Sequence, residues 1–198
     1  MNGSNDKIIT HYTKDGLLDR ILGKLAASGI SVDALTSADL KPVDEFHIGG
    51  VEATDDLLDQ LEIGTVTQML DIGSGIGGTA RHIVAHHGAQ VTGLDLTPEF
   101  VDAARRLTEL VGLTATFQVG SALDMPFAND QFDLATLIHV GMNLPDKPKL
   151  FSEAARVLRP GGSFAIYDVM RLGDEHPAFP LPWASAPEAS FLATPKTY

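Results

Sequence analysis

The chain has 198 residues, of which 44% are hydrophobic and 20% charged, a balance typical of a globular domain with its own core. Its 14 basic and 26 acidic residues give a formal net charge of −12, which argues against nucleic acid as a partner because such binding depends on cations that contact phosphate. There is no cysteine, which excludes disulfides and thiolate catalysis, and no apolar run is long enough for a membrane span. We therefore expect a cytoplasmic protein that acts on a small molecule, with no nucleic-acid or membrane partner and with an oligomeric state that the sequence leaves open.

The first 60 residues contain two segments with helical periodicity, around 17–27 and 53–61. Between them, the stretch up to Gly50 is interpreted as a loop region. We expect residues 1–60 to form a helical cap that belongs to the same domain as the rest and covers its ligand crevice.

From residue 67 onward, apolar strand patterns alternate with helical ones, which predicts parallel strands joined by right-handed crossovers. The fold class is therefore α/β, with a doubly wound, mostly parallel Rossmann-like sheet in residues 61–170. Ligands of such sheets bind at the carboxyl ends of the strands, near the point where the strand order reverses. The expected strands are 67–72, 89–96, 114–119, 132–139 and 163–169, and the expected helices are 79–87, 98–111 and 150–158.

Residues 171–198 are rich in proline and hold the only tryptophan, Trp183, which fits either a substrate lid or a surface loop with one aromatic anchor. Thr97-Pro98 and Thr194-Pro195 are both typical helix starts, with a capping hydroxyl and then a proline. The second is followed by only three residues. We interpret the chain as lacking C-terminal strands, which leaves an unprotected sheet edge after the fifth strand.

The stretch "MLDIGSGIGG" places glycines between the first strand of the sheet and the next helix, and Gly73, Gly75 and Gly78 match the pattern GxGxxG. Such glycines permit a tight turn and close approach of a ligand to the backbone. Asp95 ends the second strand, where a carboxylate can accept both hydroxyls of a ribose. An adenosine-type ligand is expected.

Asp71 distinguishes two ligands of that type. The pyrophosphate of NAD rests on a helix N-terminus and would be repelled by a carboxylate two residues before the first glycine. S-adenosylmethionine has no phosphate and carries a sulfonium and an ammonium, which a carboxylate attracts. Asp71 therefore favours S-adenosylmethionine as the cofactor, with S-adenosylhomocysteine as the product.

The segments "LDIGSGIGG", "GLDL", "FDLATLIHVGMN" and "ARVLRPGGSFAIYD", in this order, resemble class I S-adenosylmethionine-dependent methyltransferases. The resemblance covers about residues 49–168. Upstream, "HYTKDGLLDRIL" and "FHIGGVEATDDLLDQL" are similar to the N-terminal segments of phosphoethanolamine and sarcosine/dimethylglycine N-methyltransferases.

This resemblance implies a role for each matching position. Asp71, Gly73 and Gly75 would line the methionine part of the cofactor. The ribose would lie on Asp95. On the adenine side, Leu96 would lie against the base, and Ser121 and Ala122 stand where the family often has an aspartate that bonds the adenine amino group. His139 would lie near the methionine moiety, and Tyr12 and His47 belong to segments that close over the cofactor.

Methyl transfer to an amine depends on alignment of the reactants and exclusion of water and needs no strong base. A hydroxyl acceptor, by contrast, is helped by a base. Tyr12 and His139 are the candidate catalytic residues. Phosphobase methyltransferases pair an N-terminal tyrosine with a histidine, and the alignment places Leu144 at the histidine position, so that pair is incomplete. His82, His86 and His87 share a helix, but without a carboxylate motif they are interpreted as a solvated face and not as a metal site.

The sequence thus predicts a methyltransferase that acts on a small-molecule acceptor, with an amine favoured. Oxygen or carbon acceptors, an NAD(P)-dependent oxidoreductase and an inactive cofactor-binding fragment are the alternatives. An NAD(P)-dependent oxidoreductase needs no acid at position 71, so the presence of Asp71 counts against that alternative.

Overall fold

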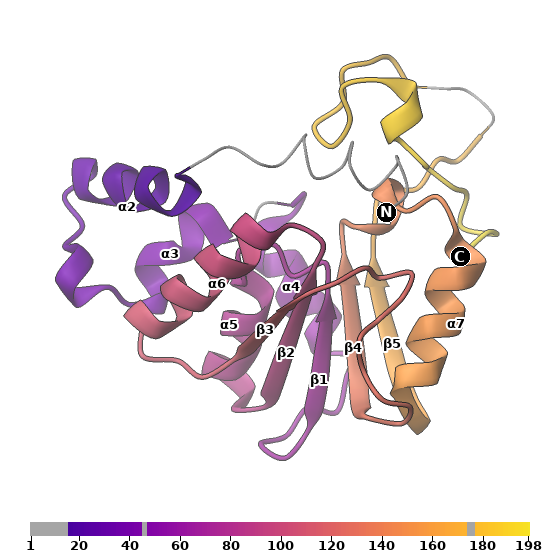
Figure 1. Cartoon of the computed structure of the whole chain (residues 1–198), viewed down its shortest axis with the longest axis horizontal. Coiled ribbons are helices and arrows are strands. Elements are labelled where there is room, and N and C mark those ends of the chain that lie inside the picture. The colour runs from indigo at the N-terminus through magenta and orange to yellow at the C-terminus, as the bar shows by residue number, and fades with distance from the viewer. Residues whose placement is uncertain (1–15, 45–46, 174–176) are drawn as a thin grey trace.

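A computed structural model of the chain describes residues 16–44, 47–173 and 177–198 (Figure 1). Its central feature is a sheet of five parallel strands in the order β3-β2-β1-β4-β5. The strand order reverses between β1 and β4, as in a doubly wound fold, so the predicted fold class is confirmed. The strands are β1 (Gln68–Ile72), β2 (Gln90–Asp95), β3 (Thr116–Val119), β4 (Phe132–Ile138) and β5 (Leu158–Tyr167).

Helices cover both faces of this sheet because its strands carry apolar side chains on both sides. One face packs against α4, α5 and α6 through Met69, Val91 and Leu134. The other face packs against α7 through Leu70 and Leu137. The helices are α2 (Leu17–Ala27), α3 (Ser37–Asp44), α4 (Gly50–Leu58), α5 (Gly78–His87), α6 (Pro98–Leu110) and α7 (Lys147–Val157), and three short 3₁₀ turns are η1 (Val32–Ala34), η2 (Gly141–Asn143) and η3 (Pro187–Ala189).

The stretch before Gly50 is not the loop region that its pattern suggested, because it contains η1 and α3. Pro42 lies inside α3, and an internal proline argues against a helix at the sequence level. The helix forms because Leu40 is fully buried in a cluster with Ile21 of α2 and Leu107 of α6. The N-terminal helices thus pack beside α5 and α6. Residues 1–15 of the expected cap lie outside the described residues.

The helix α6 starts and stops where the sequence indicated, but its predicted cap is wrong in detail. Pro98 opens the helix, and Gly112 follows it with a φ of 68° and donates to Glu109 O at 3.0 Å. The hydroxyl of Thr97 makes no capping hydrogen bond to the helix. Instead, the backbone nitrogen of Thr97 donates to Asp95 Oδ1 at 2.8 Å, which joins the start of the helix to the end of β2.

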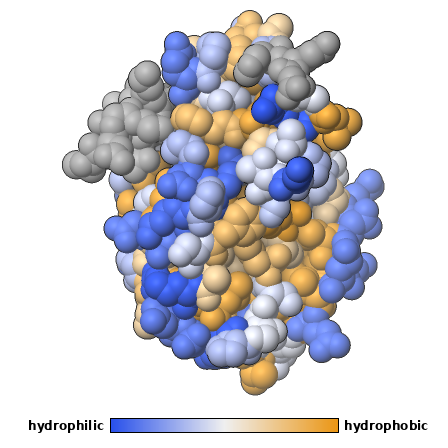
Figure 2. All heavy atoms as spheres, turned by 90° about the vertical axis from the view of Figure 1, so that its right-hand side faces the viewer, coloured by the Kyte–Doolittle hydropathy of each residue, from blue (hydrophilic) through white to orange (hydrophobic). Residues whose placement is uncertain are grey.

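Within the described part of the chain, β5 is an edge strand, as expected. Figure 2 shows apolar surface on the side of the molecule that carries α7 and β5 in Figure 1, and Phe164 and Ile166 of β5 are only partly buried. Among the residues described, none of the helices combines the length and the apolar character needed to cross a bilayer.

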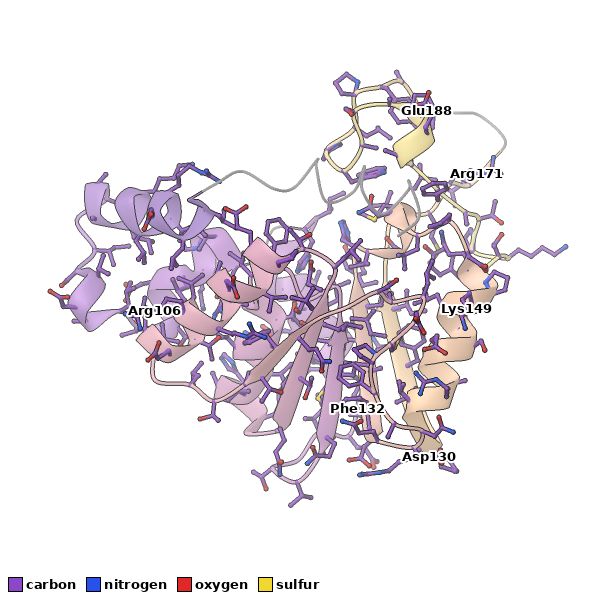
Figure 3. The ribbon with its side chains drawn as sticks, in the orientation of Figure 1. Arg106, Asp130, Phe132, Lys149, Arg171 and Glu188 are labelled. Carbon is purple, nitrogen blue, oxygen red and sulfur yellow. The ribbon has the colours of Figure 1, made fainter. Side chains whose placement is uncertain are left out.

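The segment after β5 lies at the carboxyl end of the sheet, where Figure 3 places Arg171 and Glu188, whereas Asp130 and Phe132 lie toward the opposite end. Phe191 N donates to Met142 O at 2.7 Å, which fastens this segment to the turn after β4.

Candidate functional site

The glycine-rich turn after β1 uses its own N–H groups internally. Gly73 N and Ser74 N both donate to Leu94 O of β2, at 2.7 and 3.0 Å, and Gly77 N donates to Ser74 O at 2.8 Å. Gly73 has a φ of 76°, and a Cβ there would lie 2.2 Å from a methyl carbon of Val140. These groups are therefore committed to holding the turn and are not available to a phosphate.

Asp95 joins this turn to the end of β2. Its Oδ2 accepts from Gly75 N at 2.8 Å, and its Oδ1 accepts from Thr97 N at 2.8 Å. Burial raises the pKa of the Asp95 carboxyl, although these backbone hydrogen bonds oppose the rise. The side chain of Thr97 and the backbone of Leu96 also donate to this carboxylate. Gly75, with a φ of 51°, has open space around its Cβ position, so a ligand can approach the backbone there.

The first turn of α5 packs against the end of α3. A Cβ at Gly78 would lie only 2.2 Å from the carbonyl oxygen of Asp44. Arg81, with 1% of its surface exposed, forms an ion pair with Asp44 and donates to Thr108 Oγ1 at 3.1 Å. A carbonyl oxygen and a carboxylate of Asp44 thus lie beside the first turn of α5, where their negative charge disfavours a bound anion.

Asp71 lies in the middle of the sheet, next to the point of strand reversal. It is 3% exposed, and Thr136 Oγ1 of β4 donates to its Oδ1 at 3.1 Å. The register places Asp71 opposite Gly93 of β2 and Thr136 of β4. The carboxylate is therefore held from the neighbouring strand at the start of the glycine-rich turn.

His139 directly follows β4 and has a φ of 54°, which non-glycine residues seldom adopt and which marks functional sites. Its ring lies 5.6 Å from that of His47 and 5.4 Å from that of Tyr167, centroid to centroid. Burial, and then the neighbouring His47, lowers the pKa of His139 from 6.5 to about 4. The structure thus brings together two histidines predicted separately, and adds Tyr167, whose only signal in the sequence was its position near the end of a strand.

The residues expected on the adenine side lie on partly buried backbone after β2 and β3. They are Leu96, Ser121 and Ala122. Ser121 Oγ accepts from Leu123 N at 3.1 Å, so the hydroxyl oxygen stabilises its own turn.

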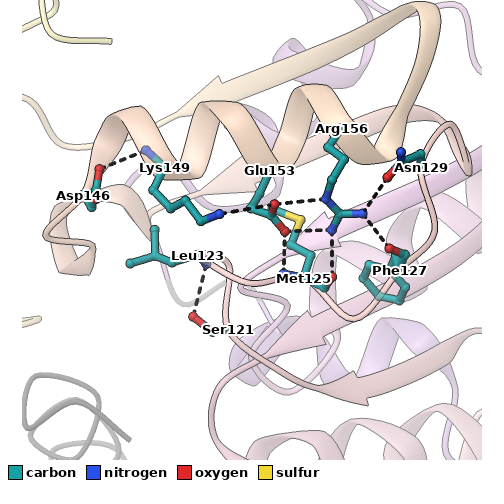
Figure 4. Close-up of polar contacts among 9 residues, drawn as sticks. All are labelled: Ser121, Leu123, Met125, Phe127, Asn129, Asp146, Lys149, Glu153 and Arg156. Atoms are coloured by element: carbon teal, nitrogen blue, oxygen red, sulfur yellow. Dashed lines mark hydrogen bonds and ion pairs between the residues drawn. The ribbon is translucent and has the colours of Figure 1, made fainter.

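An ion pair on α7 anchors the loop that follows Ser121 (Figure 4). Glu153, 5% exposed, accepts from Met125 N at 2.8 Å and from Arg156 Nη2 at 2.7 Å. Arg156 also donates to Phe127 O at 2.7 Å and Met125 O at 2.8 Å. The hydrogen bonds of Arg156 lower the pKa of Glu153 to about 2. These contacts fasten the loop between β3 and β4 to α7.

Asp168 directly follows β5. Its Oδ1 accepts from Val169 N at 2.8 Å, and its Oδ2 accepts from the hydroxyl of Tyr198 at 2.7 Å. Lys147, 4% exposed, donates to Leu144 O at 2.7 Å and to Phe191 O at 2.9 Å. Burial lowers the pKa of Lys147 and raises that of Asp168. Together these groups hold residues 190–198 against the end of the sheet.

The histidines of α5 are not all solvated. His82 is 9% exposed and its Nε2 donates to Asp55 Oδ1 of α4 at 2.6 Å, while its ring stacks on that of His86 at 4.1 Å. The prediction of a solvated face is therefore wrong for His82, because α4 packs over it. Among the described residues, no group of three His, Cys, Asp or Glu side chains could hold a metal ion. Leu144 is buried in the core, and Tyr12 lies outside the described residues.

Comparisons with known proteins agree with this arrangement. Residues 70–166 match the family model "Methyltransferase domain". The chain is 32% identical over 174 residues to 2-methyl-6-phytyl-1,4-hydroquinone methyltransferase of Synechocystis sp., covering 83% of this chain and 52% of that protein. It is 41% identical over 100 residues to ajmaline N-methyltransferase of Rauvolfia serpentina, covering 50% of this chain and 34% of that protein.

The fold is also similar to a solved structure, that of phosphoethanolamine N-methyltransferase 2 of Haemonchus contortus in complex with S-adenosyl-L-methionine. The TM-score is 0.58 and the sequence identity 30%, and the match covers 63% of this chain and 29% of that one. The chain therefore spans about half or less of the length of these relatives. The glycine-rich turn, the acids after β1 and β2 and the matched family model together identify the chain as a member of the class I S-adenosylmethionine-dependent methyltransferases.

Proposed function

We propose that this chain binds S-adenosylmethionine at the carboxyl ends of β1 and β2 and transfers its methyl group to a small amine. The carrying observation is that the glycine-rich turn lies between two carboxylates, Asp71 and Asp95, and that the N–H groups of Gly73, Ser74, Gly75 and Gly77 are bonded within the protein. Both features disfavour the pyrophosphate of a dinucleotide, which needs free N–H groups and no neighbouring anion. A sulfonium cofactor needs no such N–H groups, and the carboxylates of Asp71 and Asp95 on either side of the turn favour its cationic groups.

The residues of the turn suit this cofactor. Gly75 offers bare backbone next to open space, and the Asp95 carboxylate, held by Gly75 N and Thr97 N, is proposed to bind the ribose hydroxyls in place of the side-chain hydrogen bond from Thr97. Leu96, Ser121 and Ala122 would border the adenine. His47 and Tyr12 are proposed to close over the bound cofactor.

When bound, S-adenosylmethionine supplies an activated methyl group, so that the acceptor's lone pair forms a bond to the methyl carbon while the carbon–sulfur bond breaks and its electron pair stays on sulfur. The protein's part is to align the acceptor and exclude water. His139 is proposed to face the acceptor as a neutral imidazole, because burial lowers its pKa to about 4, and the proton that the methylated nitrogen later loses passes to solvent water.

Titration calorimetry with S-adenosylhomocysteine, and with NAD in a parallel experiment, tests this proposal. Saturable binding of S-adenosylhomocysteine alone is expected, followed by methyl transfer in a screen of amines with oxygen and carbon acceptors as comparison. Binding of NAD alone would overturn the assignment of the cofactor. Binding of S-adenosylhomocysteine without transfer to any acceptor would favour a cofactor-binding fragment.

A further inference from the structure

Three aromatic rings from three separate elements meet at the carboxyl ends of β4 and β5. They belong to His47, which precedes α4, to His139, which follows β4, and to Tyr167, which ends β5. The ring centroids of His139 and Tyr167 are 5.4 Å apart, those of His47 and His139 are 5.6 Å apart, and those of His47 and Tyr167 are 6.1 Å apart. We call these three rings the aromatic cluster.

Hydrogen bonds and close packing of the neighbouring backbone hold the aromatic cluster in place. His139 N donates to Tyr167 O at 2.8 Å, which continues the pairing of β4 with β5. His47 Nε2 lies 3.0 Å from Thr54 Oγ1 of α4, and its Nδ1 lies 3.1 Å from Ile48 O. Because a carbonyl oxygen only accepts, Nδ1 carries the proton, and a neutral His47 then accepts from Thr54. Gly49 has a φ of 90°, and a Cβ there would lie 2.6 Å from Ala53 Cβ and 3.3 Å from the Tyr167 hydroxyl, so glycine lets this segment pass close to Tyr167.

The aromatic cluster is not closed off as core residues are. All three side chains are only partly buried, whereas the core residues of β4 are at most 9% exposed. Val140, directly after His139, contacts Gly73 of the glycine-rich turn, so the aromatic cluster stands next to the proposed methyl donor site. A group that rests on these rings would lie within the crevice in which a methyl acceptor must bind.

The charges around the aromatic cluster favour a cation. Asp71, Asp95 and Asp168 all stand at or next to the carboxyl ends of strands, and the chain has a formal net charge of −12. Lys147, at the same end, has its Nζ bonded to two backbone carbonyls. The imidazole of His139 is neutral at pH 7, because burial lowers its pKa to about 4. Uncharged ring faces in negative surroundings attract ammonium groups.

We propose that the aromatic cluster of His47, His139 and Tyr167 is the acceptor subsite. It holds the nitrogen of an N-alkyl amine, which must be neutral to accept the methyl group, and it binds the alkylated ammonium group that the transfer creates. This rests on the proposed function and adds to it the chemical class of the acceptor and a binding residue, Tyr167. The ring faces provide cation–π attraction for N-methyl groups, and the neighbouring carboxylates provide the long-range field. A hydroquinone or another uncharged acceptor would gain nothing from that field.

Tetramethylammonium and its uncharged isostere tert-butanol separate charge from shape. We would titrate each into the full chain saturated with S-adenosylhomocysteine and follow the ring protons of His47 and His139 by NMR. Tetramethylammonium is expected to shift these signals saturably and tert-butanol to bind at least fivefold more weakly. Tyr167→Leu should weaken the binding of tetramethylammonium about five- to tenfold, while Tyr167→Phe keeps it, because the ring face and not the hydroxyl makes the contact.

Phe164→Leu is the matched control, since Phe164 lies on the same strand but packs toward α7, against Phe151. It should leave the affinity for tetramethylammonium unchanged. The subsite would be overturned by equal binding of the two probes or by unchanged binding of tetramethylammonium in Tyr167→Leu. It would also be overturned if hydroquinone shifted the histidine signals and tetramethylammonium did not. A wild-type chain that binds no S-adenosylhomocysteine in calorimetry would instead overturn the proposed function and the subsite with it.

Discussion

Gly75 N donates to Asp95 Oδ2 at 2.8 Å, so the acid at the end of β2 holds the glycine-rich turn that follows β1. The same carboxylate also accepts from Thr97 N, so it joins the turn to the start of α6. In this arrangement the backbone of the proposed cofactor site is held in place by the protein itself.

Asp95→Asn is expected to weaken the binding of S-adenosylhomocysteine at least tenfold, because hydrogen bonds to a charged group contribute about 1.5–3 kcal/mol and the amide cannot accept on both sides. Titration calorimetry measures this change. Asp102→Asn is the control, since Asp102 lies on the exposed face of α6 and pairs only with Arg105 at 3.1 Å. Equal affinities in the two variants would contradict a role for Asp95 in binding.

Gly78→Ala should destabilise the chain by about 1–3 kcal/mol, because a methyl group has no room against the backbone of Asp44 and α3 must move. Urea unfolding measures the loss. Gly23→Ala in α2 is the matched control, since nothing lies within 4 Å of its Cβ position and alanine is favoured in a helix by about 0.5–1 kcal/mol. If both variants gained stability, the close approach of α3 to α5 would be wrong.

Glu153→Gln should cost about 1–3 kcal/mol of unfolding free energy at pH 7, because the amide loses its charge-assisted hydrogen bonds to Arg156. The folded pKa of Glu153 is depressed from 4.5 to about 2, so its contribution is present above pH 4.5 and is lost as the pH falls toward 2. The difference in stability between wild type and variant should therefore shrink over that range in urea unfolding.

Glu109→Gln provides the comparison, since its pair with Arg106 is exposed and such pairs contribute little. A loss at pH 7 as large in Glu109→Gln as in Glu153→Gln would show that burial does not determine the effect.

His139 should titrate near pH 4 in an NMR titration of its ring protons, because burial disfavours the imidazolium. The unfolded chain takes up this proton near pH 6.5, so the free energy of unfolding should fall as the pH decreases from about 6.5 to about 4. His139→Asn, which tolerates a positive φ, should make that fall shallower. A ring that titrates near pH 6.5 in the folded chain would count against a neutral imidazole at the site.

Part of this site could be predicted from residue order alone. Period-2 and helical patterns fix which segments pair in parallel, and the turn after β1 must hold glycines wherever a positive φ or a close contact is required, as at Gly73. Asp71 and Asp95 end up at one edge because parallel strands share their carboxyl ends. These features depend on local backbone and topology, which a sequence encodes directly.

Only the tertiary structure decided the rest. The helical state of residues 37–44, the buried pair of Arg81 with Asp44 and the burial of His82 depend on which helix packs over which, and their local patterns point the other way. The aromatic cluster joins residues from three segments that are distant in the sequence. No spacing in the sequence predicts that His47, His139 and Tyr167 lie next to one another. Local preference determined the sheet and its turn, while long-range packing determined the chemistry next to it, because contacts between distant segments leave no periodic signal in the chain.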